Sequence, residues 1–225
     1  MREEKAQLLI LEVRICFCPN PNCRFSFRFI SLESMAGKMH AQTLRCFVEA
    51  LGRKQPTPGG GAAAAVAASI GAAAGAMASI YTTRKSDERR GAAEGARKLH
   101  TRLVDAANRA FDLADADADA YADLQRTWKE KDMDAKVKSD IEQRALDVPC
   151  ELLKLCHAEV MAIHEWLPSC NPMIKSDAFV SIHLLAAASK AAYQTALVNS
   201  PPDSLKKSLR QMVADIDDVD AKILQ

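Results

Sequence analysis

Residues 56–81 read PTPGGGAAAAVAASIGAAAGAMASIY, and this stretch decides which fold the rest of the chain can adopt. Its two prolines and three consecutive glycines end any preceding helix, so we expect a loop over 56–61. Residues 62–81 carry no charge and are mostly alanine, which favours a helix. Ala67, Gly71 and Gly75 share one face of that helix, where small residues let another backbone approach closely. We therefore predict a buried helix at the centre of a bundle or across a dimer seam.

The uncharged run also resembles a membrane span in length. Alanine contributes little to membrane insertion, however, and the run contains no leucine, so its hydrophobicity is marginal. Burial in a soluble bundle explains this composition better, and we expect no contact with a membrane. A membrane anchor stays the alternative.

The composition of the whole chain favours one soluble, all-helical domain. A length of 225 residues suits a single core. The 30 basic and 29 acidic residues leave a net charge of +1, which provides no field that would attract nucleic acid. Seven cysteines without a secreted spacing indicate reduced thiols and a cytoplasmic location. Cys16, Cys18 and Cys23 cluster, but not at zinc-site spacing, so we expect no metal site.

The pattern of apolar residues divides the chain into a leader and a helical domain. Residues 1–34 resemble nothing that follows, and we interpret them as a disordered or non-native extension of a domain at 35–225. Prolines and glycines separate the helical stretches, so the connections are short and neighbouring helices should be antiparallel. The prediction is an all-α, antiparallel, dimeric bundle around the alanine- and glycine-rich helix. Besides that helix, the periodicity predicts helices near 40–51, 88–128, 139–167, 177–198 and 204–224.

One acidic residue in the helix over 88–128 differs from its neighbours. At about 100° per residue, most aspartates of the run 112–123 fall on one polar face, which we interpret as solvated. Asp117 falls inside the apolar stripe, where an ionised carboxylate is costly unless it is paired or lines a cavity. Asp117 is therefore a candidate site residue, with a buried structural acid as the alternative.

Two further segments have both a functional and a structural interpretation. The loop over 56–61 permits close ligand approach, and the amides at the start of the following helix could bind an anionic or carbonyl group. A tight turn before a buried helix would explain the same glycines. Ser176 and Asp177 precede an apolar run, so helix capping also accounts for them.

These segments together resemble the formiminotetrahydrofolate cyclodeaminase and methenyltetrahydrofolate cyclohydrolase family. The resemblance covers roughly residues 40–220 and starts with Pro56-Thr57-Pro58-Gly59-Gly60-Gly61. It continues through Thr82 and Lys85, 117–121, Val148-Pro149, Asn171-Pro172 and Ser176-Asp177-Ala178 to Asn199. The resemblance implies a helical homodimer with a folate groove near the glycine loop and the subunit seam. Its partner would be a tetrahydrofolate derivative, with a single or polyglutamate tail, and no further cofactor.

The resemblance also implies roles for individual residues. Asp177 and Asp117 would be the catalytic acid and base in converting 5-formiminotetrahydrofolate to 5,10-methenyltetrahydrofolate with release of ammonia. The other implied roles concern substrate binding. The pterin or the reacting centre would be held by Thr57, Pro58, Gly59, Gly60 and Gly61. Asn171 and Ser176 would orient it, and Arg84 and Lys85 would bind the glutamate tail.

Two positions depart from the family pattern. Ala62 replaces a usual serine, and Met173 replaces a usual second asparagine, so each removes a polar group. They favour the alternative of an inactive folate-binding or scaffold homologue. A second alternative is a cyclohydrolase that forms 10-formyltetrahydrofolate, because the motifs do not distinguish the two reactions.

Overall fold

The computed structural model describes residues 43–130 and 132–224. Within these ranges the chain forms seven α-helices and two short 3-10 helices, and it has no strand. The all-α prediction is confirmed. The predicted leader, the proposed domain start at Met35 and the three clustered cysteines of the leader lie outside the described residues.

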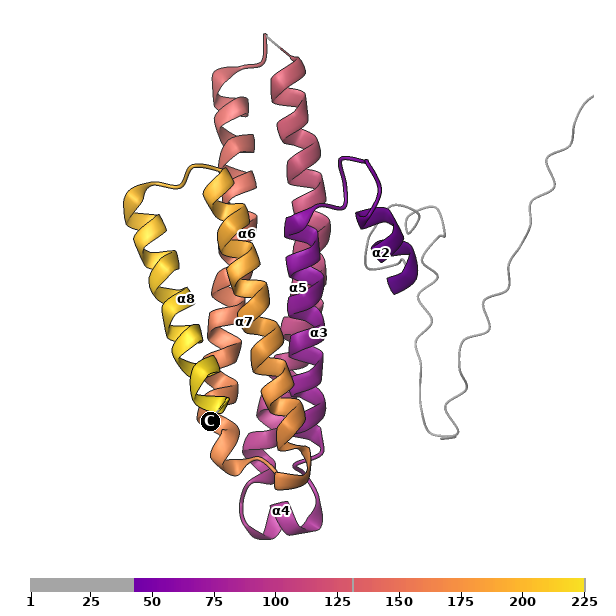
Figure 1. Ribbon diagram of the computed structural model, residues 1–225, viewed down its shortest axis with the longest axis vertical. Coiled ribbons are helices and arrows are strands. Elements are labelled where there is room, and N and C mark those ends of the chain that lie inside the picture. Colours follow the sequence, from indigo (N-terminus) through magenta and orange to yellow (C-terminus); the bar gives the residue numbers. More distant parts are fainter. Residues whose placement is uncertain (1–42, 131, 225) are drawn as a thin grey trace, which may run out of the picture. The chain divides into compact units, whose positions relative to one another are not determined.

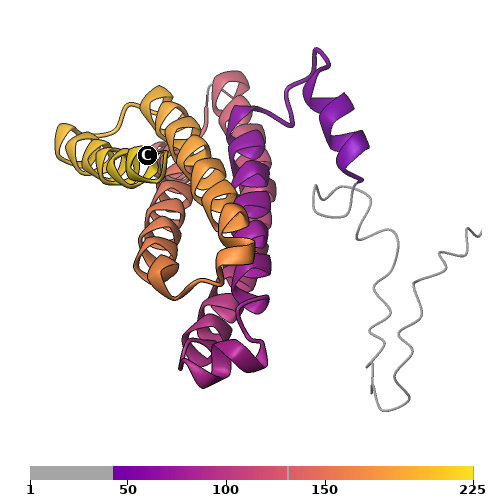
Figure 2. The same cartoon turned by 60° about the horizontal axis from the view of Figure 1, so that its bottom comes forward.

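The helices are α2 (Leu44–Leu51), α3 (Gly60–Ile80), α4 (Lys85–Arg89), α5 (Ala93–Lys129), α6 (Ala135–Trp166), α7 (Lys175–Val198) and α8 (Asp203–Ile223), with the 3-10 helices η2 (Leu167–Ser169) and η3 (Pro172–Ile174) between α6 and α7. The bundle consists of α3, α5, α6 and α7, and each of these runs antiparallel to the next along the chain (Figure 1). α3 packs against α5 and α7, and α6 closes the bundle by packing against the same two helices. α8 covers α6 and α7 on one side (Figure 2).

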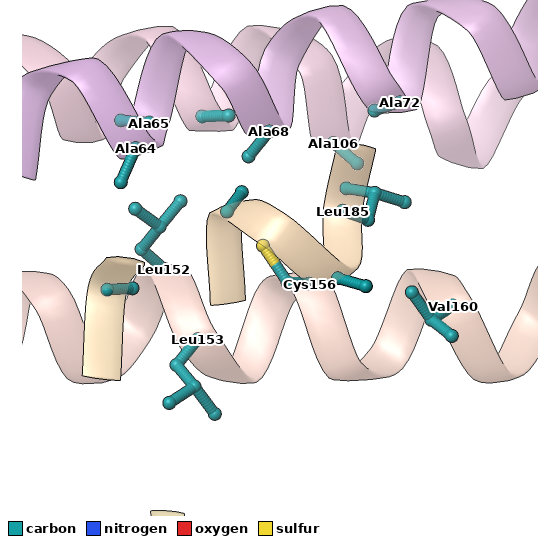
Figure 3. Close-up of a cluster of buried hydrophobic side chains, with 14 of the residues drawn as sticks. Ala64, Ala65, Ala68, Ala72, Ala106, Leu152, Leu153, Cys156, Val160 and Leu185 are labelled. Atoms are coloured by element: carbon teal, nitrogen blue, oxygen red, sulfur yellow. The ribbon is translucent and has the colours of Figure 1, made fainter. Parts of the chain in front are cut away.

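The small residues of α3 let α7 approach its backbone, as the sequence predicts. A Cβ atom on Gly71 would lie 3.1 Å from the Leu184 Cβ atom and 3.2 Å from the Leu185 amide nitrogen. The Ser181 hydroxyl donates a hydrogen bond of 2.6 Å to the Gly71 carbonyl. The small side chains of α3 face leucines of α6 and α7 in the core (Figure 3). α3 is thus a central helix of the bundle.

Among the described helices, α3 is the one long and apolar enough to cross a membrane by length and composition. Inside the bundle, 61% of its most apolar window is buried against other helices. Core packing therefore accounts for its lack of charge.

Several helix boundaries differ from the predicted ones. α3 begins at Gly60, inside the segment expected to be a loop, and α7 begins at Lys175, two residues before the expected start. A continuous helix is expected from Glu88, but α4 ends at Arg89 and α5 begins at Ala93. Gly91 lies between them with φ of 76°, a left-handed conformation that favours glycine and interrupts the helix. α6 begins at Ala135, earlier than expected, because the Asp134 side chain accepts hydrogen bonds from two amides of its first turn.

The hairpin of α5 and α6 extends beyond the other long helices (Figure 1). The Ala62 amide at the start of α3 meets Asp117 of α5, so α5 continues past that level for about 18 Å at 1.5 Å per residue. Asn199 at the end of α7 donates to the Ala145 carbonyl of α6, and α6 reaches about 15 Å beyond that level. One face of this projecting hairpin is therefore left uncovered by α3 and α7.

Candidate functional site

The start of α3 is completed by a carboxylate from another helix. Gly59 occupies the N-cap position and has no side chain to accept a hydrogen bond. The Ala62 amide donates instead to the Asp117 Oδ2 atom at 2.9 Å. A Cβ atom on Gly61 would lie 2.5 Å from the Asp117 Cγ atom, so only glycine leaves room for this contact. The glycine at 61 and the acid at 117 therefore form one structural unit.

Asp117 is a carboxyl group whose environment disfavours ionisation. Burial raises its pKa above the ordinary value of 3.8, and the hydrogen bond from the Ala62 amide lowers it only in part. No lysine or arginine among the described residues forms an ion pair with it. The sequence-based placement of Asp117 in the apolar stripe is consistent with this burial. A carboxyl group whose pKa is raised holds its proton to a higher pH than an ordinary aspartate, and it can act as a general acid or base.

Asp117 lines a cleft of about 830 Å³ below the projecting hairpin. This volume is in the range of small-molecule sites. Residues 56–61, which form the loop before α3 and its first two positions, and the ends of α6 and α7 form its other sides. Thr57, Gly59, Gly60 and Gly61 line the cleft as expected for site residues, whereas Pro58 does not. The amides of Gly60 and Gly61 accordingly lie at the positive end of the α3 dipole.

Two aromatic side chains of α5 also line the cleft, and the sequence reasoning did not select them as site residues. Tyr121 and Trp128 contact edge to face, with ring centroids 6.2 Å apart. Trp128 is 65% exposed, which is unusual for so large an apolar side chain. The signal in the sequence was their spacing: residues 117, 121 and 128 share one face of a helix.

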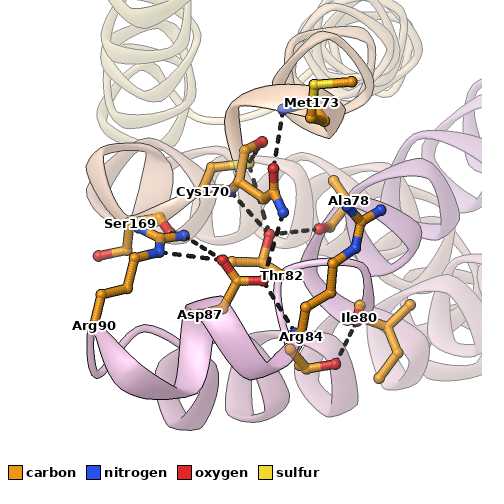
Figure 4. Close-up of polar contacts among 11 residues, drawn as sticks. Ala78, Ile80, Thr82, Arg84, Asp87, Arg90, Ser169, Cys170 and Met173 are labelled. Carbon is orange, nitrogen blue, oxygen red and sulfur yellow. Dashed lines mark hydrogen bonds and ion pairs between the residues drawn. The ribbon is translucent and has the colours of Figure 1, made fainter.

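A second polar cluster lies at the opposite end of α3 (Figure 4). Asp87 is 2% exposed and accepts hydrogen bonds from the Arg84 amide and from the Arg90 guanidinium at 3.0 to 3.1 Å. Burial works to raise the pKa of Asp87, but these hydrogen bonds outweigh it and hold the pKa below 3.8. Arg90 also donates to the Ser169 carbonyl at 2.7 Å. Asp87 thereby ties α4 to the connection between α6 and α7.

Asn171 belongs to this second cluster. Its backbone amide donates to the Thr82 hydroxyl at 3.1 Å, and its side-chain oxygen accepts from the Met173 backbone amide at 3.0 Å. Its Nδ2 atom lies 3.5 Å from the Asp87 Oδ2 atom. Both ends of the Asn171 side chain are thus engaged within the protein. The Met173 side chain itself is 80% exposed.

The remaining predicted site residues surround this cluster. Arg84 and Lys85 are exposed beside α4, and the Arg84 guanidinium lies 6.0 Å from the centre of the Tyr81 ring. Ser176 and Asp177 lie in the first turn of α7, and neither makes a capping hydrogen bond. The Asp177 carboxylate has no hydrogen bond or ion pair with any described residue, and it lies at the positive end of the α7 dipole. The alternative of a side-chain cap does not hold for these two residues.

The predicted site residues therefore form two groups in one protomer. Asp117 and the glycine segment lie at the start of α3, while Asn171, Arg84 and Lys85 lie beyond its end and Asp177 lies level with its last turns. The length of α3 places the groups about 30 Å apart. A single folded chain does not bring the two candidate catalytic aspartates together.

Metal chemistry has no evident site in the described part of the chain. Over 43–130 and 132–224 no group of three or more histidine, cysteine, aspartate or glutamate side chains is arranged to hold an ion. The four cysteines in these ranges, Cys46, Cys150, Cys156 and Cys170, are free thiols. Burial raises the pKa of Cys156 to about 12, so it remains protonated.

Comparison with known proteins agrees with the fold and the motifs. The sequence profile of the family described as formiminotransferase-cyclodeaminase matches residues 43–217. The chain is also similar to the crystal structure of formiminotetrahydrofolate cyclodeaminase from Thermotoga maritima, with a TM-score of 0.70. Sequence identity to that protein is 18%, over 82% of this chain and 93% of that chain, so the similarity concerns the fold. A search of curated protein sequences gives no match.

Proposed function

This chain belongs to the formiminotransferase-cyclodeaminase family, and we propose that it converts 5-formiminotetrahydrofolate to 5,10-methenyltetrahydrofolate with release of ammonia. The observation that carries this proposal is Asp117, a half-buried carboxyl of raised pKa in a cleft beside the first backbone amides of α3. Besides the exchange of one C–N bond for another, the reaction needs only proton transfers, so no cofactor beyond the folate is required. A cytoplasmic location belongs to the same proposal and is supported by the free cysteines.

The chemistry requires one proton to move between two nitrogens. The formimino group enters as its amidinium ion, and N10 attacks the formimino carbon to form the new N10–C bond. A base then removes the proton from N10, and an acid delivers it to the amino nitrogen. The C–N bond to this nitrogen breaks, ammonia leaves, and the positive charge stays on the methenyl bridge. A carboxyl of raised pKa suits such an exchange because its ionised form is a stronger base than an ordinary aspartate and can then return the proton that it has accepted.

Two subunits packed with their α3 helices antiparallel would bring Asp117 of one subunit close to the partner subunit's Asp177. The outer stripe of α3 carries Ile70, Met77 and Ile80, and Val180 of α7 lies beside it. These apolar side chains are 41% to 47% exposed and favour burial against another surface. A two-fold axis near Ile70, the midpoint of α3, would place the start of α3 in one protomer beside the end of α3 in the other. The homodimer expected from the sequence is thus part of the proposal.

In this dimer each cleft would receive groups that its own protomer lacks. Asp117 and the glycine loop of one subunit would face the partner subunit's Asp177, with the partner's Arg84 and the partner's Lys85 close by. Two carboxyl groups would then serve as base and acid, and the two cations would bind the glutamate tail. The dimer explains why Asp177, Arg84 and Lys85 have no evident function within one chain.

Asparagine substitutions test the proposed catalytic roles. In Asp117→Asn the side-chain oxygen can still accept from the Ala62 amide, so folding should be retained. Turnover should fall by about 100-fold or more, because the titratable group is lost. The same loss is expected for Asp177→Asn. The exposed Asp119→Asn on the same helix as Asp117 is the matched control and should leave the rate unchanged.

The assay follows methenyltetrahydrofolate by its absorbance, with thermal melts of each variant alongside. Full turnover in Asp117→Asn or Asp177→Asn removes that residue from the mechanism. The same assay started from methenyltetrahydrofolate reports the alternative cyclohydrolase reaction. If the intact protein binds 5-formyltetrahydrofolate but turns over neither substrate, the scaffold alternative is correct.

A further inference from the structure

The projecting part of α5 and α6 carries a binding surface that the proton-transfer mechanism does not use. We propose that Trp128 and Tyr121 hold the bicyclic pterin ring of the folate, and that Glu142 accepts the paired N–H groups of its 2-amino-4-oxo edge. This inference rests on the proposed function, because it assigns the orientation of the folate in the same cleft. Trp128 and Glu142 lie outside the family motifs, and the mechanism uses neither of them nor Tyr121.

The position of the aromatic pair supports a ring-binding role. Asp117, Tyr121 and Trp128 lie 4 and 7 residues apart along α5 and all line the cleft. Tyr121 and Trp128 of α5 contact each other edge to face, and Trp128 nevertheless remains 65% exposed. A planar ligand ring stacked on Trp128 would remove a large apolar surface from water. A pterin held there would have its reacting nitrogens on the side toward Asp117.

The charge of the cleft distinguishes the two ends of a folate. Among the described residues that line it, the only charged side chains are those of Asp117 and Glu142. Both are acidic, so the cleft disfavours the carboxylates of a glutamate tail. A pterin ring, in contrast, presents N–H donors along its pyrimidine edge and no negative charge. The cleft therefore fits the ring end of the substrate, with the tail directed out of it.

The Glu142 carboxylate is suited to accept hydrogen bonds from the pyrimidine edge of the pterin ring. The ring nitrogen and the 2-amino group offer two parallel N–H donors, which a carboxylate accepts in the same two-point geometry that it uses with arginine. Glu142 comes from α6, while the aromatic pair comes from α5. Its ion pair with Lys138 is long at 3.9 Å, and its side chain is 56% exposed. The carboxylate is thus available to a ligand in the cleft.

Intrinsic fluorescence tests the ring assignment directly, because the chain has only two tryptophans. Trp166 is buried near the far end of α6, about 30 Å from the level of Ala145. In Trp166→Phe the emission reports on Trp128 alone. We expect 6-methyltetrahydropterin, the ring without a tail, to quench this emission. p-Aminobenzoylglutamate, the tail without the ring, should leave it unchanged. Quenching by the tail fragment and not by the ring fragment overturns the proposal.

Affinity for 5-formyltetrahydrofolate, measured by calorimetry on the full chain, tests the individual residues. Trp128→Ala should weaken binding by about 10-fold or more, the usual effect of removing one stacking partner. Trp128→Phe should restore most of the affinity. Glu142→Gln should weaken binding by about 10-fold because one of two acceptor oxygens becomes a donor. Glu165→Gln, an exposed position at the other end of α6, is the matched control and should bind as the intact protein does.

The outcomes separate this inference from the proposed function. If the intact protein binds 5-formyltetrahydrofolate and all variants bind it equally well, the ring assignment is wrong and the proposed function stands. If the intact protein binds no folate, both are wrong. Oligomeric mass is measured for each variant, since a Trp128→Ala protein that dissociates but keeps its affinity would identify Trp128 as a contact between subunits and overturn the proposal.

Discussion

The most informative structural perturbation is Gly61→Ala, because it tests whether Asp117 completes the start of α3. An added Cβ atom would lie 2.5 Å from the Asp117 Cγ atom and 2.8 Å from its Oδ2 atom, both far inside van der Waals contact. The carboxylate would have to move away and would lose its hydrogen bond to the Ala62 amide. A lost helix cap costs about 1 kcal/mol, and overpacking adds about 1 to 3 kcal/mol.

Helix propensity opposes this cost, because alanine is favoured over glycine in a helix by about 1 kcal/mol. The expected net loss for Gly61→Ala is therefore about 2 kcal/mol. In a domain of this size that loss lowers the melting temperature by about 4 to 8 °C. Gly60→Ala is the matched control, since nothing lies within 4 Å of a Cβ atom at that position. It should leave stability unchanged or raise it by up to about 1 kcal/mol.

Urea denaturation of the two single variants, and of each in an Asp117→Ala background, measures the coupling. Removing the carboxylate should make Gly61→Ala as harmless as Gly60→Ala, because the clash is then absent. Equal stability of Gly61→Ala and Gly60→Ala in the original background would refute the proposed contact between Gly61 and Asp117.

Three further predictions follow from the packing and the charges. Gly71→Leu should lower the free energy of unfolding by about 3 kcal/mol or more, because its side chain would enter the contact with Leu184; an unchanged urea midpoint excludes that contact. Asp87→Ala should cost about 2 kcal/mol at neutral pH, because the Arg84 amide and the Arg90 Nε atom lose the carboxylate that accepts their hydrogen bonds. Folding lowers the pKa of Asp87, so the ionised carboxylate stabilises the fold fully above its unfolded pKa of about 3.8, and this stabilisation is lost as the pH falls below that value. Denaturation curves of Asp87→Ala and of the original protein should therefore converge in acid. Burial raises the pKa of Asp117, so kcat/KM should fall on the acid side at a pH above 3.8, and this limb should be absent in Asp117→Asn.

The sequence predicts the helices well where periodicity and composition agree. The small residues of α3 require close packing in any helical fold, and Gly71 meets α7 as expected. The break between α4 and α5 was missed because Glu88, Arg89 and Arg90 favour a helix, and a single glycine does not show that its φ will be positive. Such boundaries depend on tertiary contacts, here the hydrogen bonds of Asp87 and Arg90 with Asn171 and Ser169 in the segment after α6.

The candidate site was predictable only in part. The helical wheel singled out Asp117 by its position in the apolar stripe, but its partner, the Ala62 amide, is 55 residues away along the chain. Motif order also says nothing about which end of the bundle a motif occupies, so the separation of Asp117 from Asp177 required the structure. Trp128 was missed because Lys129 and Glu130 beside it are typical of a solvated helix end. Its exposure and its place in the cleft become visible only when α5 extends past α3.

The central claim is that one active site combines Asp117 of one subunit with the partner subunit's Asp177, and mixing two inactive variants tests it most directly. Asp117→Asn and Asp177→Asn proteins are unfolded together, refolded and assayed on 5-formiminotetrahydrofolate. Random pairing makes about half of the dimers mixed, each with one intact site, so about one quarter of the original activity should return. A mixture no more active than the two separate variants, at an oligomeric mass that shows dimers, would contradict the account.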